Sequence, residues 1–239
     1  MIQKTPRVER QRQKRKGELT TMLMEKERNL VVEYGKKLIT ENLTDGTGGN
    51  ISIYDPETGL MAISPSGMDY FKIQPEDIVI MNLDGEIVDG DRKPSSEKDL
   101  HIEMYKAKPG MTAAVHTHAM FCTTLACMGT PIYSVHYVLA DAATDVVPVT
   151  PYVTYGTKEL ALAATETIGE GKATLLANHG FISIGKDIND AFGIARECEW
   201  VAQIQWRTMC VGKPNILDRE EMERVMVKFQ SYGQVKAKK

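Results

Sequence analysis

The chain has 239 residues, 42% hydrophobic and 26% charged, which is ordinary for a globular protein with one large domain or two small ones. The net charge of −3 gives no overall indication of nucleic-acid binding, and no stretch approaches the roughly 18 apolar residues of a membrane span. The four scattered cysteines form neither a disulfide scaffold nor the repeated CxxC of a zinc finger, which is typical of a cytoplasmic protein.

Basic charge is concentrated at the N-terminus. Residues 1–16 carry seven Lys or Arg and one Glu, a charge of +6, which leaves −9 for the rest of the chain. Because this segment has almost no apolar residues to bury, we predict a disordered extension over residues 1–20 and a single domain over residues 21–239. A polyanion-binding arm is the alternative for the extension. Otherwise we expect neither a membrane nor a nucleic acid among the partners.

The first half of the chain predicts a helix followed by two β-hairpins. Apolar residues recur at three-to-four spacing over about residues 19–42, and the glycine-rich segment 44–49 ends this helix. Residues 51–54 and 60–63 flank one turn, and residues 77–81 and 87–88 flank another, which predicts two hairpins. A helix is predicted over about residues 96–106, with Ser95 or Ser96 near its N-cap.

Strands and helices alternate in the second half. Strands are predicted at 112–118, 146–149, 174–177 and 181–184, and helices at 119–128, 157–168, 187–209 and 217–229. Neither an internal repeat nor a Pro/Ser-rich linker divides the chain. The pattern predicts one domain with a mixed sheet covered by helices.

Three of the five histidines stand where they could share a metal ion. His116 and His118 end a predicted strand, and because strand side chains alternate faces, both imidazoles project from the same side. His179 interrupts an apolar strand pair, where an imidazole needs a polar partner. Glu97 stands at a helix start, where backbone amides favour a carboxylate. Three imidazoles leave a fourth zinc position open, as in a catalytic site, whereas simple hydrogen-bonded histidines are the alternative.

Three loops of small residues offer backbone N–H groups and short polar side chains. They span residues 48–52, 64–67 and 94–96. Such groups bind phosphate oxygens, although each loop taken alone is also typical of an ordinary turn. The glycine run leads into a strand and lacks a GK[ST] sequence, so it predicts neither a dinucleotide fingerprint nor a P-loop. A metal and a phosphate site together suit a phosphorylated carbonyl substrate.

A family resemblance rests on the segments GTGGNISI, ISPSGMDY, KPSSEKDLH, AVHTHAMFCTTLA and ATLLANHGFI. Together, from about residue 27 to 233, they resemble the class II aldolase/adducin-domain family, which includes sugar-phosphate aldolases and ribulose-phosphate 4-epimerases. Within the family the likeness is greatest to the L-fuculose-1-phosphate aldolases. It rests there on Glu97 after two serines, the His136–Tyr137 pair, the stretch 151–157 and the C-terminal Tyr-Gly.

The resemblance implies a fold, an assembly and a set of residue roles. The fold is an α/β three-layer sandwich whose mixed, largely antiparallel central sheet is flanked by helices, assembled as a homotetramer with active sites at subunit interfaces. One Zn²⁺ per subunit would be bound by Glu97, His116, His118 and His179. Glu97 would also be the catalytic acid/base, and Tyr137 of a neighbouring subunit the proton donor. Substrate or its phosphate would be bound by Gly49, Asn50, Ser66, Gly67, Ser95, Ser96, Tyr155, Phe229 and Tyr232.

Two of these positions carry a further implication. Tyr155 occupies a position that is phenylalanine in the fuculose enzymes, so an aromatic ring is kept there. Phe229 and Tyr232 match C-terminal aromatics that close over the aldehyde.

The activity implied is a lyase step of fucose degradation. It is the zinc-dependent retro-aldol cleavage of L-fuculose 1-phosphate, or a related deoxyketose 1-phosphate, to dihydroxyacetone phosphate and L-lactaldehyde. One alternative is a ribulose-phosphate 4-epimerase, a group in which the residue at the Glu97 position is typically aspartate. Others are an aldolase of 5-deoxypentulose phosphates and a non-catalytic adducin-like binding module.

Overall fold

A seven-stranded sheet forms the centre of the computed structural model, which describes residues 22–229 and 231. Its strand order is β4 (Ile87–Asp89), β3 (Val79–Asn82), β2 (Leu60–Ile63), β1 (Asn50–Asp55), β5 (Ala113–Thr117), β9 (Gly180–Gly185) and β8 (Ala173–Leu176). All six pairings are antiparallel, and both predicted hairpins are confirmed. A separate two-stranded sheet pairs β6 (Ile132–Tyr133) with β7 (Val146–Val147).

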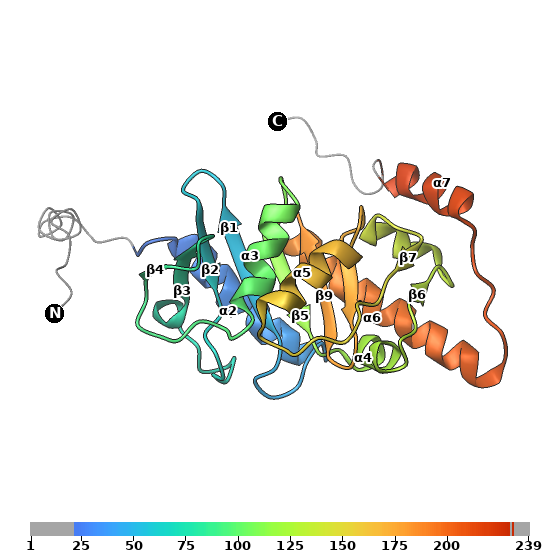
Figure 1. The fold of residues 1–239 in the computed structure, drawn as a ribbon, viewed down its shortest axis with the longest axis horizontal. Helices are drawn as coiled ribbons and strands as arrows, with labels where there is room; N and C mark the ends of the chain where they lie inside the picture. The colour runs from blue at the N-terminus through green and yellow to red at the C-terminus, as the bar shows by residue number, and fades with distance from the viewer. Residues whose placement is uncertain (1–21, 230, 232–239) are drawn as a thin grey trace, which may run out of the picture.

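Helices cover both faces of the sheet (Figure 1). The helices against the sheet are α2 (Glu25–Thr40), α3 (Lys98–Ala107), α4 (Met120–Cys127), α5 (Lys158–Thr167) and α6 (Ile188–Val211). Helix α7 (Arg219–Phe229) packs instead on the 3₁₀ turn η2 (Tyr137–Ala142), and a second 3₁₀ turn is η1 (Pro75–Asp77). In Figure 1, α3 and α5 lie in front of the sheet and α2 and α6 behind it. The predicted three-layer α/β sandwich is therefore confirmed.

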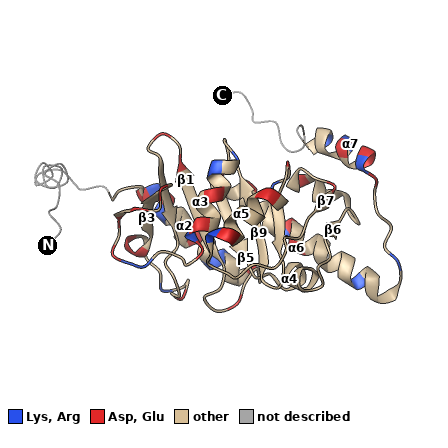
Figure 2. Ribbon diagram, in the orientation of Figure 1, with Lys and Arg blue, Asp and Glu red and all other residues tan. Residues whose placement is uncertain are grey.

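Alternation along the strands produces two separate apolar cores. In β5, Val115 belongs to the core beneath α2, α4 and α6, while its neighbour Ala114 belongs to the core beneath α3 and α5. Strands buried on both faces have no place for charge, and β5, β8 and β9 contain no Lys, Arg, Asp or Glu. Figure 2 accordingly shows the charged residues on helices and loops around these central strands.

Some element boundaries differ from those predicted. The first helix of the described residues, α2, begins at Glu25, because Met24 has the left-handed φ of 54° that breaks a right-handed helix. The part of the predicted helix before residue 22 lies outside the described residues. The predicted strand 146–149 ends at Val147, since Pro148 has no N–H to donate. The short β6 and the two 3₁₀ turns were not predicted. The predicted N-terminal extension, residues 1–20, lies outside the described residues.

Two predicted helix starts are confirmed by their caps. Thr157 Oγ1 accepts a hydrogen bond from Leu160 N, and Asp187 Oδ1 accepts one from Asp190 N. Among the helices described, none is both long and apolar enough to cross a membrane.

Arg28 joins α2 to the far edge of the sheet. Its guanidinium is buried and donates hydrogen bonds to the carbonyls of Leu23, Pro75 and Ile78 and to the Asp89 carboxylate. We expect Arg28→Met to lower the free energy of unfolding in urea by about 3 kcal/mol, because three carbonyls lose their donor and the ion pair is broken.

The control for Arg28→Met is Arg224→Met on α7. Arg224 forms ion pairs with Glu220 and Glu221, but all three side chains are largely exposed. We expect the unfolding midpoint of Arg224→Met to equal that of the unmodified protein. Equal losses in the two variants would contradict the role assigned to Arg28.

Candidate metal centre and active site

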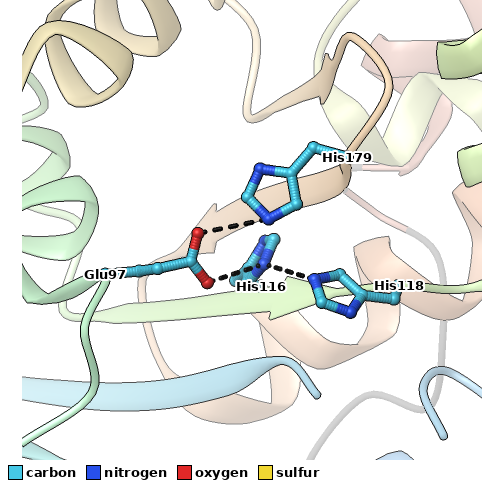
Figure 3. Close-up of side chains that lie close together, drawn as sticks. All are labelled: Glu97, His116, His118 and His179. Atoms are coloured by element: carbon cyan, nitrogen blue, oxygen red, sulfur yellow. Dashed lines mark hydrogen bonds and ion pairs between the residues drawn. The ribbon is translucent and has the colours of Figure 1, made fainter. Parts of the chain in front are cut away.

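Four side chains from three separate segments of the protein converge on one point (Figure 3). His116 lies on β5, His118 follows that strand, His179 lies in the β8–β9 turn, and Glu97 directly precedes α3. His116 Nε2 is 3.1 Å from both His118 Nε2 and Glu97 Oε2, and His179 Nε2 is 3.2 Å from Glu97 Oε1. The structure thus brings together all four residues predicted as metal ligands.

Two glycines permit this convergence. A Cβ on Gly180 would lie 2.4 Å from the Thr117 carbonyl oxygen and 2.9 Å from His118 Cδ2, so only glycine lets the His179 turn approach β5. Gly49 has a φ of +70°, and a Cβ there would lie 2.7 Å from the His116 carbonyl oxygen. The glycine-rich loop before β1 therefore lies directly against the histidine strand.

The donor set fits a divalent cation. His116 Nδ1 donates to the Phe181 carbonyl at 2.9 Å, which orients Nε2 as the ligand atom. Glu97 Oε1 and His179 Nδ1 are buried without a hydrogen-bond partner. The 3.1–3.2 Å spacings are close to the roughly 3.3 Å between ligand atoms that each lie about 2.0 Å from a tetrahedral zinc ion. The cluster can therefore bind a metal.

The charge states of the four side chains also suit a bound divalent cation. Burial lowers the pKa of His118 and that of His179 to about 4, so both rings are neutral at pH 7. Burial alone would raise the pKa of Glu97, but His116, His179 and the Asn50 amide lower it, so the carboxylate is ionised. Burial opposes a charge on His116, yet Glu97 raises its pKa overall. A divalent cation would replace that proton as the counter-charge of Glu97.

A cavity of about 370 Å³ opens beside the cluster. Its lining includes Glu97, His118 and His179, together with Gly49, Asn50, Ser66, Gly67, Ser95, Ser96 and Tyr155 from the predicted substrate-binding set. Two of the loops meet through a β-bridge between Pro65 and Pro94, with Ser95 N donating to the Ser64 carbonyl. Backbone N–H groups of such loops suit phosphate oxygens, so the cavity brings the loops predicted to bind phosphate beside the metal-ligand cluster.

The start of α3 lies two residues later than predicted, at Lys98. Glu97 occupies the N-cap position, and Ser95 Oγ accepts a hydrogen bond from Glu97 N at 3.2 Å. Ser95 therefore fixes the backbone from which the Glu97 side chain projects.

The remaining predicted site residues lie elsewhere or outside the described residues. Tyr137 is half-exposed on η2, with its ring 6.1 Å from Phe229 and 4.6 Å from His136, and neither Tyr137 nor Phe229 lines the cavity. The role of Tyr137 in a neighbouring subunit stays a prediction. Tyr232 lies outside the described residues. Tyr152, which also lines the cavity, was missed, although it belongs to the 151–157 stretch that carries the resemblance.

Known proteins resemble this protein over most of its length. Residues 29–206 match the family described as Class II Aldolase and Adducin N-terminal domain. The chain is 49% identical over 213 residues to a 5-deoxy-D-ribulose 1-phosphate aldolase of Bacillus thuringiensis, covering 89% of this chain and 100% of the relative. It is 35% identical to an L-fuculose phosphate aldolase of Escherichia coli K12, covering 80% and 88%.

A solved structure also resembles the chain. It is that of an L-fuculose 1-phosphate aldolase, which superposes with a TM-score of 0.84 at 42% identity and covers 86% of this chain and 96% of its own.

Proposed function

Because the chain belongs to the Class II Aldolase and Adducin N-terminal domain family, we propose that it cleaves a deoxyketose 1-phosphate into dihydroxyacetone phosphate and a short aldehyde. The observation that carries the proposal is the complete Glu97/His116/His118/His179 cluster at a cavity lined by small-residue loops. A non-catalytic binding module has no need of an open metal site. The reaction takes place in the cytoplasm.

The preferred substrate is 5-deoxyribulose 1-phosphate, with acetaldehyde as the second product. Supporting this choice is the 49% identity to the Bacillus thuringiensis protein, against 35% to the Escherichia coli L-fuculose phosphate aldolase. L-fuculose 1-phosphate, which the sequence motifs favour, is the second candidate and has the support of the 42% identical solved structure. It would give L-lactaldehyde. Both substrates are 1-phosphorylated ketoses that end in a methyl group.

Glu97, His116, His118 and His179 would hold one Zn²⁺ per subunit. When bound, the ion supplies Lewis-acid stabilisation of the negative charge that C–C cleavage places on the ketone oxygen. A lysine Schiff base is not required as the electron sink.

The chain's own side chains position the substrate and move protons. Ser66, Gly67, Ser95 and Ser96 bind the phosphate from two loops of the cavity wall. In cleavage the C4 hydroxyl gives up its proton, the C3–C4 bond breaks and its electron pair stays with C3. Glu97, which has taken up a proton from solvent, delivers it to that carbon. In the synthetic direction the ionised Glu97 carboxylate removes the same proton. Tyr137 of a neighbouring subunit in a homotetramer exchanges the proton on the aldehyde oxygen.

A substrate panel tests the proposal. The zinc-loaded protein is supplied with 5-deoxyribulose 1-phosphate, L-fuculose 1-phosphate or ribulose 5-phosphate, and released dihydroxyacetone phosphate is measured by coupled NADH oxidation. We expect release from both 1-phosphates, with kcat/KM at least about tenfold higher for 5-deoxyribulose 1-phosphate. The two substrates differ by one carbon, and one extra or missing carbon in a fitted pocket changes the free energy of transition-state binding by about 1–3 kcal/mol. Absence of release from every compound contradicts the aldolase, and epimerisation of ribulose 5-phosphate supports the epimerase alternative.

A further inference from the structure

A buried chain of hydrogen bonds runs from the catalytic carboxylate into the core between β1 and α3. Asn50 Nδ2 donates to Glu97 Oε2 at 3.0 Å, and Asn50 Oδ1 contacts His101 Nε2. His101 Nδ1 lies 2.6 Å from Ser52 Oγ, which lies 2.6 Å from the Tyr105 hydroxyl. Asn50, Ser52, His101 and Tyr105 are all buried. Asn50 also lines the cavity, whereas Ser52, His101 and Tyr105 do not. The hydrogen-bond chain therefore connects Glu97 to groups behind the cavity wall.

The repeat distances of a helix and a strand explain how these residues meet. Glu97 is the N-cap of α3, and His101 and Tyr105 follow it at intervals of four residues within the helix. The three side chains therefore lie on one face of α3. Asn50 and Ser52 are two residues apart and share one face of β1. Four helical residues span about 6 Å and two strand residues about 6.8 Å, so the two rows stay in step.

The proton positions along this chain of hydrogen bonds follow from the ionised Glu97 carboxylate at one end of it. An ionised carboxylate only accepts hydrogen bonds, so the Asn50 amide nitrogen must face it and the amide oxygen must face His101. That oxygen also only accepts, so His101 carries its proton on Nε2. Nδ1 of the neutral ring then accepts from the Ser52 hydroxyl. The Asn50 amide, the His101 ring and the Ser52 hydroxyl therefore each donate in the direction of Glu97.

We propose that His101 is a positioning residue for Glu97, acting through the orientation of the Asn50 amide. A reversed amide would place its oxygen against the Glu97 carboxylate, and His101 Nε2–H prevents that reversal. Burial lowers the pKa of His101 to about 3, so the ring stays neutral and this arrangement holds at neutral pH. The orientation holds Glu97 Oε2 close to His116 while Oε1 faces His179. This inference rests on the role of Glu97 in the proposed function.

The first measurement needs neither substrate nor activity. Affinity for Zn²⁺ is determined by chelator competition for the full-length protein and its variants. We expect His101→Leu to weaken zinc binding 10- to 100-fold, roughly the loss seen when a residue that orients a ligand is removed. His101→Gln keeps an N–H donor toward Asn50 and is expected to restore the affinity to within about threefold. Equal weakening in both variants, or none in His101→Leu, overturns the proposal.

Tyr105→Phe is the matched control. It removes a buried hydroxyl at the far end of the same chain, while Ser52 can still donate to His101. We expect a lower unfolding midpoint with zinc affinity unchanged. A loss of zinc affinity in Tyr105→Phe as large as in His101→Leu would mean that the hydrogen-bond chain acts only through the general stability of the fold. That result would overturn the proposal.

A second measurement uses the unmodified protein, so it stands even when a variant does not fold. ¹⁵N-histidine labelling reports which ring nitrogen of His101 bears the proton, with the signal assigned through its proximity to the Tyr105 side chain. We expect Nε2–H, and an Nδ1–H tautomer overturns the proposal. If no substrate of the panel is cleaved but the zinc affinities and the His101 tautomer are as expected, only the aldolase proposal is rejected. If cleavage occurs but the zinc affinities or the tautomer differ, only the role of His101 is rejected.

Discussion

Glu97→Gln is expected to reduce cleavage by about 10²- to 10⁴-fold and to abolish exchange of the C3 protons of dihydroxyacetone phosphate with solvent. The amide is nearly isosteric with the carboxylate but has no basic oxygen to take the proton. His116, His118 and His179 remain, so we expect the variant to bind zinc more weakly yet to contain it after loading. Deuterium incorporation followed by NMR measures the exchange, and elemental analysis measures the zinc.

The matched control is Glu103→Gln, the same substitution on α3. Glu103 is largely buried like Glu97, but its carboxylate pairs with Lys106 at 3.2 Å and lies away from the cluster. We expect its exchange rate to equal that of the unmodified protein. Undiminished exchange in Glu97→Gln would remove Glu97 from the proton-transfer role.

The metal cluster was predictable because its signals are local in the sequence. His116 and His118 are two residues apart at a strand end, and His179 interrupts an otherwise apolar strand pair. The antiparallel pairing of β5 with β9 then brings the His179 turn beside His116. Periodicity also predicted both hairpins and the capped starts of α5 and α6.

The hydrogen-bond chain that leads from Glu97 to His101 was not predictable from such local signals. His101 carries no local signal of its own, because its spacing from Glu97 acquires meaning only when α3 lies over β1. The meeting of two loops predicted to bind phosphate likewise depends on the bridge between Pro65 and Pro94, 29 positions apart. Contacts between distant segments depend on tertiary packing, which one sequence's periodicity does not specify.

Metal removal is expected to abolish activity while leaving the fold intact. The two apolar cores on either face of the sheet are continuous without the cluster, so the far-UV circular dichroism of the chelated protein should match that of the zinc-loaded one. The unfolding midpoint should fall, because a ligand present at about 1,000 times its Kd stabilises the native state by about 4 kcal/mol. Adding Zn²⁺ should restore both midpoint and activity. Global unfolding on chelation would instead indicate a structural metal.

A pair of histidine variants separates the cluster from the other histidines. His179→Ala removes a ligand whose Nδ1 has no hydrogen-bond partner, so we expect loss of zinc with little change in the apoprotein's unfolding midpoint. His136→Gln changes a histidine that lies against Tyr137 and Trp200, outside the cluster, and should retain one zinc per subunit. Because both variants remove one imidazole, a zinc content that falls equally in the two would contradict the assignment of His179 as a ligand.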